Sequence, residues 1–243
     1  MYIAMVAPDR APVAKAGRLP TYEGMRNGDI WGLQPSHHGL WVPWYGGAVH
    51  CTVWFGYVHG GKCFFIEPHL AGDSFGWDLL YGYGDDMARF AFFAKAALEF
   101  LLESGKRTEV IHCHDWQAGL VPVLLYEQYR EETPFQRVCC TILNFRRRGL
   151  TGPEVLWATQ LGRPEYFLDA DWLGDDTRYR AANLMRGGVA YSNFVTTVST
   201  SHVSEAHSAC EAGRTWGGTA VGIDFPRCAT GPSGFFGRQP CSW

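Results

Sequence analysis

The sequence has 243 residues, of which 47% are hydrophobic and 19% charged, with a formal net charge of −3. This is the composition of an ordinary globular protein, and its slight negative charge excludes a general attraction to nucleic acid. The dense basic run at residues 146–148 is short enough to be a solvated loop. No apolar run reaches the roughly 18 residues of a membrane span, and no secretory signal opens the chain, so we expect neither a membrane partner nor secretion. Eight scattered cysteines without a CxxC pair indicate reduced thiols.

The chain opens with a predicted strand and a loop. Residues 2–7 are apolar and precede Pro8, which favours a buried strand. In the loop, Lys15 stands two residues before Gly17; glycine lets the backbone approach a phosphate closely, and lysine adds a positive charge. An exposed loop lysine is the plainer alternative. Residues 19–39 show no helical period, so the helix and second strand expected of an α/β domain are missing there.

An aromatic β-hairpin is predicted next. Residues 49–58 alternate and are β-prone, residues 59–62 form a turn, and residues 63–67 supply the returning strand. Aromatic residues make up 15% of the chain and include ten Trp. Aromatic rings pack cores and also stack on the apolar faces of sugars, and composition leaves both uses open.

From Asp85 onward, helices and strands alternate. A helix begins at Asp85 or Asp86, carries apolar residues at three- and four-residue spacing, and ends at Ser104 and Gly105. The elements predicted after it are strands at residues 108–113, 137–142 and 194–199, and helices at residues 116–129 and 179–191. This order predicts an α/β fold with a parallel, doubly wound sheet. Beyond about residue 204 no period remains, and we expect an irregular tail.

The most informative candidate for a functional residue is Asp115, where a predicted strand ends and a predicted helix begins. In a parallel sheet this junction lies at the carboxyl edge, where such folds bind ligands. Two plainer alternatives stay open: Asp115 is a helix N-cap, and His112 and His114 are one face of a buried strand. A metal site at His-Cys-His-Asp is a weaker alternative, because Trp116 stands where the metallo-hydrolase motif has a further histidine.

Several long segments, in the right order, match one family. They are MYIAMVAPDRAPVAKAG, WGLQPSHHGLWVPWYGGAVHCTVWFGYVHGGKCFFIEPH, RFAFFAKAALEFLLESGKRTEVIHCHDWQAGLVPVLLYE, VLWATQLGRPEY and MRGGVAYSNFVTTVS. With these, the chain resembles the amino-terminal catalytic domain of glycogen and starch synthases over most of residues 1–204. The resemblance implies a Rossmann-like parallel sheet, the N-terminal half of a GT-B glycosyltransferase. It also implies a retaining transfer of glucose from ADP-glucose to the non-reducing end of an α-1,4-glucan, without a metal or another cofactor.

Four positions carry over from the family's motifs. Lys15 and Gly17 match the Lys-x-Gly-Gly-Leu loop that approaches the nucleotide sugar. Asp115 matches the aspartate of the His-Asp-Trp motif beside the transferred glucose, which implies a catalytic role. Asn144 follows the position of the active-site histidine in the Thr-Ile-His-Asn motif and is an expected substrate-binding residue.

The chain departs from the family's pattern at several places. Arg18 stands where the loop's second glycine belongs, and Leu143 stands where the family has the histidine. The domain is expected to be incomplete near residues 19–21, residues 205–243 to be the irregular tail, and the C-terminal nucleotide-binding domain to be absent. We therefore expect the isolated chain to be inactive or impaired. The alternative function is a non-catalytic remnant that binds an α-glucan or a partner. The expected location is the cytoplasm, with a plastid as the alternative.

Overall fold

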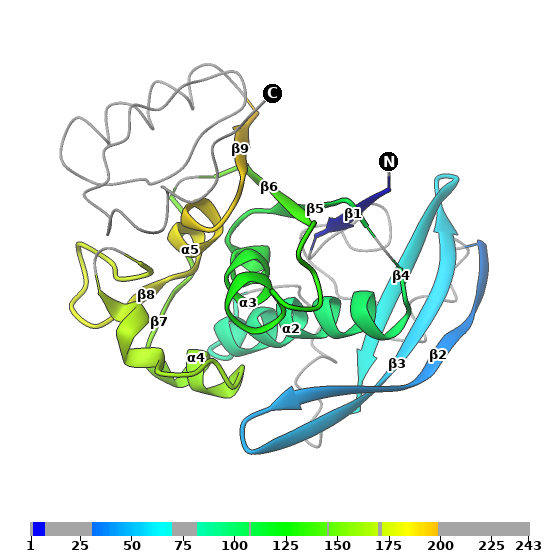
Figure 1. Ribbon diagram of the computed structural model, residues 1–243, viewed down its shortest axis with the longest axis horizontal. Coiled ribbons are helices and arrows are strands. Elements are labelled where there is room, and N and C mark those ends of the chain that lie inside the picture. Colours follow the sequence, from blue (N-terminus) through cyan, green and yellow to red (C-terminus); the bar gives the residue numbers. More distant parts are fainter. Residues whose placement is uncertain are drawn as a thin grey trace.

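The structure is a computed structural model that describes residues 2–7, 31–69, 82–106, 108–144, 146–169 and 172–198. Within them, a parallel sheet and an antiparallel sheet both pack on one long helix (Figure 1). A third, two-stranded sheet lies in the second half of the chain.

The parallel sheet has four strands in the order β1-β5-β6-β9. They are β1 (Ile3–Val6), β5 (Val110–His114), β6 (Arg137–Ile142) and β9 (Phe194–Thr197), and each pairs with its neighbour in parallel. Each strand lies within two residues of its predicted bounds. The predicted α/β fold is confirmed.

Side chains of the parallel sheet alternate between a buried face and an open face. The buried face packs on the helices α2 (Asp86–Glu103), α3 (Leu120–Gln128) and α5 (Leu184–Ala190), which lie together on one side of the sheet (Figure 1). The buried face comprises Val6, Ile111, Cys113, Val138, Cys140, Ile142 and Val195. On the opposite face Met5 is 60% exposed, and His112 is half-buried.

The helix α2 has the predicted bounds. Asp86 lies in its first turn, and Gly105 follows its end with a positive φ of 63°, the left-handed conformation that commonly closes a helix. Apolar residues cover two sides of α2. Phe90 packs towards the parallel sheet, whereas Phe92 and Phe100 pack under the antiparallel sheet.

The antiparallel sheet consists of β2 (Trp31–Trp44), β3 (Gly47–Val58) and β4 (Gly61–Pro68). The predicted hairpin is β3 and β4, joined by His59 and Gly60, both with positive φ, as in a tight two-residue turn. The residues on the inner face of the antiparallel sheet are Leu40 and Val42 of β2 and Val49, Cys51 and Val53 of β3, and they pack on α2.

The strand β2 was not predicted, because residues 19–39 showed no regular period. The structure gives the reason: the pairing of β2 with β3 shifts register between Trp31 and Gln34, between Pro35 and His37, and between His37 and Leu40. Each shift interrupts the in-out alternation by which a strand is recognised in a sequence. The first part of the predicted irregular segment, up to residue 30, lies outside the described residues.

The helix predicted at residues 116–129 is two elements. A short 3-10 helix, η1 (Trp116–Ala118), precedes Gly119, and α3 starts after it. A Cβ on Gly119 would lie 2.2 Å from the carbonyl oxygen of Leu184, so α3 and the start of α5 approach more closely than any side chain permits.

The prediction of a helix at residues 179–191 was wrong for the first half of that range. That part holds β8 (Ala182–Asn183), which pairs antiparallel with β7 (Leu150–Thr151). The helix α5 starts after Asn183, whose side-chain oxygen accepts a hydrogen bond of 3.0 Å from the backbone N–H of Arg186. An asparagine that caps a helix stands outside its regular turns, so the helix starts late. The other helices in this half are α4 (Pro153–Ala158) and η2 (Pro164–Leu168).

Candidate active site

Asp115 follows β5 directly and lies at the carboxyl edge of the parallel sheet. Its φ of 57° and ψ of −173° fall in a region that is nearly reserved for glycine and costs about 1–3 kcal/mol. Its N–H donates to the carbonyl oxygen of Thr141 at 2.9 Å, which continues the pairing of β5 with β6. The backbone is therefore held in an unfavourable conformation at the residue that carries the candidate function.

The Asp115 carboxylate connects β5 to the loop after β6. Its Oδ1 accepts hydrogen bonds from the backbone N–H groups of Leu143 at 2.8 Å and of Asn144 at 3.2 Å. Asp115 stands at the N-cap position of η1, as the plainer alternative has it, but its side chain makes no cap hydrogen bond there. The structure brings the predicted residues Asp115 and Asn144 together.

Residues 143–144 and 146–149, which we call the β6 loop, carry Asn144. The side-chain oxygen of Asn144 accepts from the N–H of Arg146 at 3.0 Å, a local turn that asparagine side chains commonly make. Leu143 is 43% exposed. An exposed apolar side chain thus stands at the position where the family resemblance places a histidine.

Gly149 closes the β6 loop against the residue next to Asp115. Its φ is +65°, and a Cβ placed on it would lie 2.4 Å from Cε3 of the Trp116 ring. Only glycine meets both conditions. Asp115 and Trp116, two consecutive residues, therefore contact the two ends of the same loop.

Two histidines line the open face of the sheet below Asp115. The rings of His112 and His114 stack at 4.4 Å between centroids, and His112 Nε2 lies 2.7 Å from the hydroxyl of Thr141. Burial lowers the pKa of His112, and burial together with the neighbouring His112 lowers the pKa of His114. Both imidazoles are therefore mainly uncharged at neutral pH. Both side chains are half-buried, stack on each other and lie on the same face of β5. This resembles the plainer alternative, in which the two histidines are one face of a buried strand.

Metal ligands do not cluster in the described part of the chain. No three His, Cys, Asp or Glu side chains gather there in an arrangement that holds a metal ion. The five cysteines in the same part, Cys51, Cys63, Cys113, Cys139 and Cys140, are free thiols. Lys15, Gly17 and Arg18 lie outside the described residues, as do residues 19–21 and 205–243.

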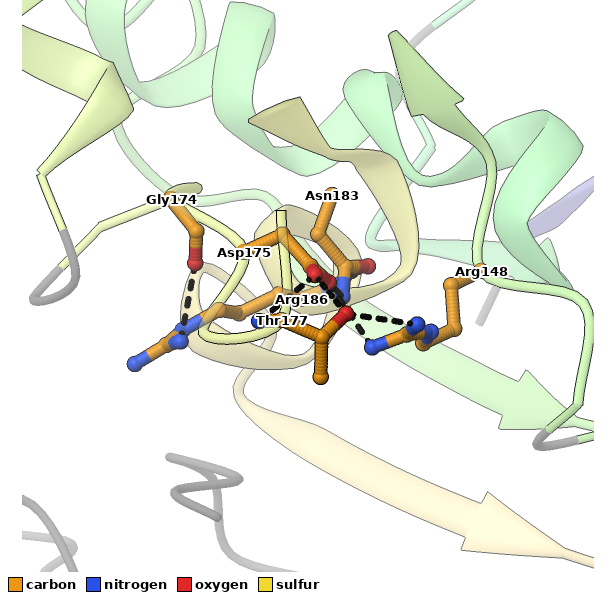
Figure 2. Close-up of polar contacts among 6 residues, drawn as sticks. All are labelled: Arg148, Gly174, Asp175, Thr177, Asn183 and Arg186. Carbon is orange, nitrogen blue, oxygen red and sulfur yellow. Dashed lines mark hydrogen bonds and ion pairs between the residues drawn. The ribbon is translucent and has the colours of Figure 1, made fainter. Parts of the chain in front are cut away.

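The basic run at residues 146–148 was predicted to be solvated, and this was wrong for Arg148. Its Nη1 lies 2.9 Å from Oδ2 of Asp175, whose side chain is completely buried. Figure 2 shows the side chains of Arg148, Asn183 and Thr177 gathered around the Asp175 carboxylate. An arginine in a basic run gives no sign of a partner 27 residues later, so sequence reasoning missed this pair. Arg146 and Arg147 are exposed, as predicted.

None of the helices in the described residues is both long and apolar enough to cross a membrane.

Comparison with known proteins decides the family. The family model described as "Starch synthase catalytic domain" matches residues 18–214. The chain belongs to this family. It is 51% identical over 229 residues to glycogen synthase 1 of Synechococcus sp. (strain JA-3-3Ab), an alignment that covers 85% of this chain and 47% of that protein. It is 50% identical to glycogen synthase 2 of Methylococcus capsulatus, covering 83% of this chain and 46% of that protein.

A solved structure agrees with these relatives. The catalytic domain of starch synthase IV from Arabidopsis thaliana, bound to ADP and acarbose, matches with a TM-score of 0.80 and 30% identity. The match covers 88% of this chain and 48% of that chain. The expected GT-B relationship is confirmed, and the chain spans about half the length of the curated relatives it matches.

Proposed function

We propose that this starch synthase family chain takes part in a glucosyl transfer from ADP-glucose to the non-reducing end of an α-1,4-glucan, with retention at the anomeric carbon. The bond from that carbon to the diphosphate oxygen breaks and ADP leaves, a bond to the acceptor hydroxyl oxygen forms, and the proton of that hydroxyl passes to the departing diphosphate. The observation that carries the proposal is the Asp115 carboxylate, fixed at the carboxyl edge of the sheet by the N–H groups of Leu143 and Asn144.

Asp115 is the proposed catalytic residue. A carboxylate accepts strong hydrogen bonds from sugar hydroxyl groups, and two backbone donors hold this one in a single orientation before substrate arrives. Preorganised polar groups of this kind lose no free energy to reorganisation during the reaction. Asn144, on the loop that contacts Asp115, is a proposed substrate-binding residue. Lys15 and Gly17 are proposed to approach the nucleotide sugar. This part of the proposal rests only on their match to the family's Lys-x-Gly-Gly-Leu motif.

Leu143 favours a second candidate function, a non-catalytic site that binds an α-glucan. Its exposed leucine side chain cannot donate or accept a hydrogen bond at the reacting sugar, and Arg18 replaces a glycine of the nucleotide-sugar loop. We therefore expect little transfer by the unmodified chain, although its fold and Asp115 are in place.

The proposed partners are ADP-glucose and an α-1,4-glucan. The Arabidopsis structure bound to ADP and acarbose supports this pair of ligand classes. For location we propose the cytoplasm or a plastid: several relatives are bacterial, and one, at 31% identity, is a probable chloroplastic or amyloplastic starch synthase of Arabidopsis.

The test is the incorporation of radiolabelled glucose from ADP-glucose into glycogen. We expect Leu143→His, alone and with Arg18→Gly, to raise incorporation above that of the unmodified chain. Adding Asp115→Asn to the best variant is expected to lower it by about 100-fold or more, because one preorganised catalytic contact is lost. Retardation by glycogen on a native gel is measured in parallel.

The outcomes separate the two candidate functions. Retardation by glycogen without incorporation by any variant would favour the non-catalytic glucan-binding site. Incorporation that survives Asp115→Asn would remove Asp115 from the catalytic role. If neither retardation nor incorporation is seen, both proposals fail.

A further inference from the structure

The β6 loop has attachments beyond the transfer site. The carbonyl oxygens of Arg148 and Gly149 accept from the N–H groups of Met185 and Leu184 at 3.0 and 3.1 Å, and the Arg148 side chain adds an ion pair. The first residues of the loop are held by Asp115 and its last residue packs on Trp116, whereas the side chain of Arg148 bonds to the residues that precede α5.

Arg148 Nη1 donates to Oδ2 of Asp175 at 2.9 Å, and Nη2 donates to the hydroxyl of Thr177 at 3.1 Å. The guanidinium of Arg148 thus bonds to two neighbouring side chains, Asp175 and Thr177. Both lie in residues 172–183, which we call the β8 segment.

Asp175 is held in place by several hydrogen bonds besides its ion pair with Arg148. Its side chain is completely buried, and it also accepts from Asn183 Nδ2 at 2.9 Å and from the N–H of Thr177 at 3.0 Å. Burial raises the pKa of Asp175, but the bonds from Thr177, the charge of Arg148 and the bond from Asn183 outweigh it and lower the pKa overall. The carboxylate stays ionised, and a buried ionised group holds its partner firmly because losing that partner is costly.

The β8 segment has anchors of its own. The N–H of Asp175 donates to the carbonyl oxygen of Ala181 at 2.9 Å, and the N–H of Asn183 donates to that of Leu173. The buried Arg186 of α5 donates from Nη1 to the carbonyl oxygen of Gly174 at 2.9 Å (Figure 2). Removing the Arg148 side chain therefore leaves the β8 segment attached to α5. The β6 loop keeps the backbone bonds of its last two residues, whose carbonyl oxygens accept from the N–H groups of Met185 and Leu184, but loses its side-chain tie.

We infer that Arg148 and Asp175 are positioning residues: their ion pair ties the β6 loop to the β8 segment and so holds the N–H groups of Leu143 and Asn144 against the Asp115 carboxylate. The inference rests on the proposed function only where it assigns this loop to the transfer site. The tie itself is a property of the folded chain. Arg148 lies four residues from Asn144, close enough for a loosened side chain to change the path of the loop.

The test is amide hydrogen exchange of the whole chain, followed by NMR at individual residues. In Arg148→Met we expect the amides of Leu143 and Asn144 to exchange at least about tenfold faster than in the unmodified chain, because a hydrogen-bonded ion pair that limits loop opening is lost. The amide of Val123, inside α3, reports overall unfolding and is expected to change less. Arg148→Lys keeps the charge and one donor, and should restore most of the protection.

Arg89→Met is the control, since Arg89 likewise pairs with an aspartate, Asp86 at the start of α2, although Arg89 is buried where Arg148 is half-buried. It is expected to leave the ratio of Leu143 and Asn144 exchange to Val123 exchange unchanged. Equal acceleration at all three amides in Arg148→Met, or no acceleration, overturns the inference. If Arg148→Met does not fold, Thr177→Val decides, because it removes one of the two acceptors of Arg148 and should give a smaller acceleration at the same two amides.

Failure of this inference and failure of the proposed function give different results. Unchanged exchange in Arg148→Met refutes the tie whatever the transfer assay shows. Selectively faster exchange, in a chain that neither binds glycogen nor transfers glucose in any variant, supports the tie and refutes the proposed function.

Discussion

Gly149 combines two constraints at one residue, a left-handed backbone and a contact with an aromatic ring. Its φ is +65°, and an added Cβ would lie 2.4 Å from the Trp116 ring. Gly105, with φ of +63° and no atom within 4 Å of an added Cβ, carries the backbone constraint alone. Comparing substitutions at the two glycines therefore distinguishes the cost of backbone strain, present at both, from the cost of steric overlap, present only at Gly149.

We predict that Gly149→Ala lowers the free energy of unfolding by about 3 kcal/mol and Gly105→Ala by about 1 kcal/mol. The larger loss at Gly149 comes from the displacement of Trp116, which is buried beside Asp115. Urea denaturation of both variants measures the difference. Equal losses would show that the Trp116 ring moves aside without cost.

Lys95 is a buried cation between α2 and α3. Its Nζ contacts the side-chain oxygen of Gln128 and lies 4.8 Å from the centre of the Tyr129 ring. Burial lowers its pKa to about 8, against the opposing effect of Glu99, from an ordinary value of 10.5. Between these two values the unfolded chain binds more protons than the folded chain, so the lysine's contribution to the free energy of unfolding rises with pH.

We predict that Lys95→Met removes this rise. The free energy of unfolding of the variant minus that of the unmodified chain should be largest below pH 8 and decline as the pH increases towards 10.5. The thiols and phenols of the chain are present in both proteins, so the difference isolates Lys95. Urea denaturation across pH 7 to 9.5 tests it, and a difference that does not vary with pH would contradict the folded-state pKa of Lys95.

At the scale of elements, Leu40 and Trp41 are neighbours on β2 that face opposite ways. Leu40 is fully buried under the antiparallel sheet, whereas Trp41 is 59% exposed and lies against the His50 ring at 5.0 Å. We predict that Leu40→Ala lowers the free energy of unfolding by about 2–5 kcal/mol, and Trp41→Ala by under about 1 kcal/mol. The reverse order, in thermal or urea denaturation, would mean that the register of β2 is shifted by one residue.

The same strand shows where sequence reasoning succeeds and where it fails. Local signals fixed α2, whose capping and apolar spacing are continuous, and the β3–β4 hairpin, whose turn contains His59 and Gly60. The strand β2 escaped detection because its register shifts interrupt the alternation, and α5 started late because Asn183 caps it. These last features depend on partners elsewhere in the fold.

The candidate site divides in the same way. The place of Asp115 at the end of a parallel strand was predictable, since it is a local signal, and the backbone N–H of Asn144 bonds to its carboxylate. The roles of both residues in the site stay predictions. The ion pair of Arg148 with Asp175 was not predictable from the sequence, because the two residues lie far apart in the chain and meet only in the folded structure. The conformation of Asp115, with its positive φ, also runs against local preference, which is common at functional sites.

At the scale of the molecule, α2 joins the two sheets. Phe90, Ala94 and Leu98 belong to the core of the parallel sheet, while Phe92 and Phe100 belong to the core of the antiparallel sheet, where Phe92 meets Trp44 edge-on at 5.2 Å. A helix buried on both sides cannot unfold from one sheet without exposing apolar surface of the other. The two sheets should therefore unfold as one cooperative unit.

We predict a single unfolding transition in urea, with the same midpoint by tryptophan fluorescence and by far-ultraviolet circular dichroism. Leu40→Ala, a change confined to the antiparallel core, should lower that midpoint for both signals and also speed the exchange of the Val123 amide in α3. Two transitions, of which Leu40→Ala moves only one, would show that the antiparallel sheet unfolds independently and that α2 stays with the parallel sheet. Coincident shifts would mean instead that a defect under the antiparallel sheet reaches the strands that carry Asp115 and Asn144, through the side chains that α2 shares between the two cores.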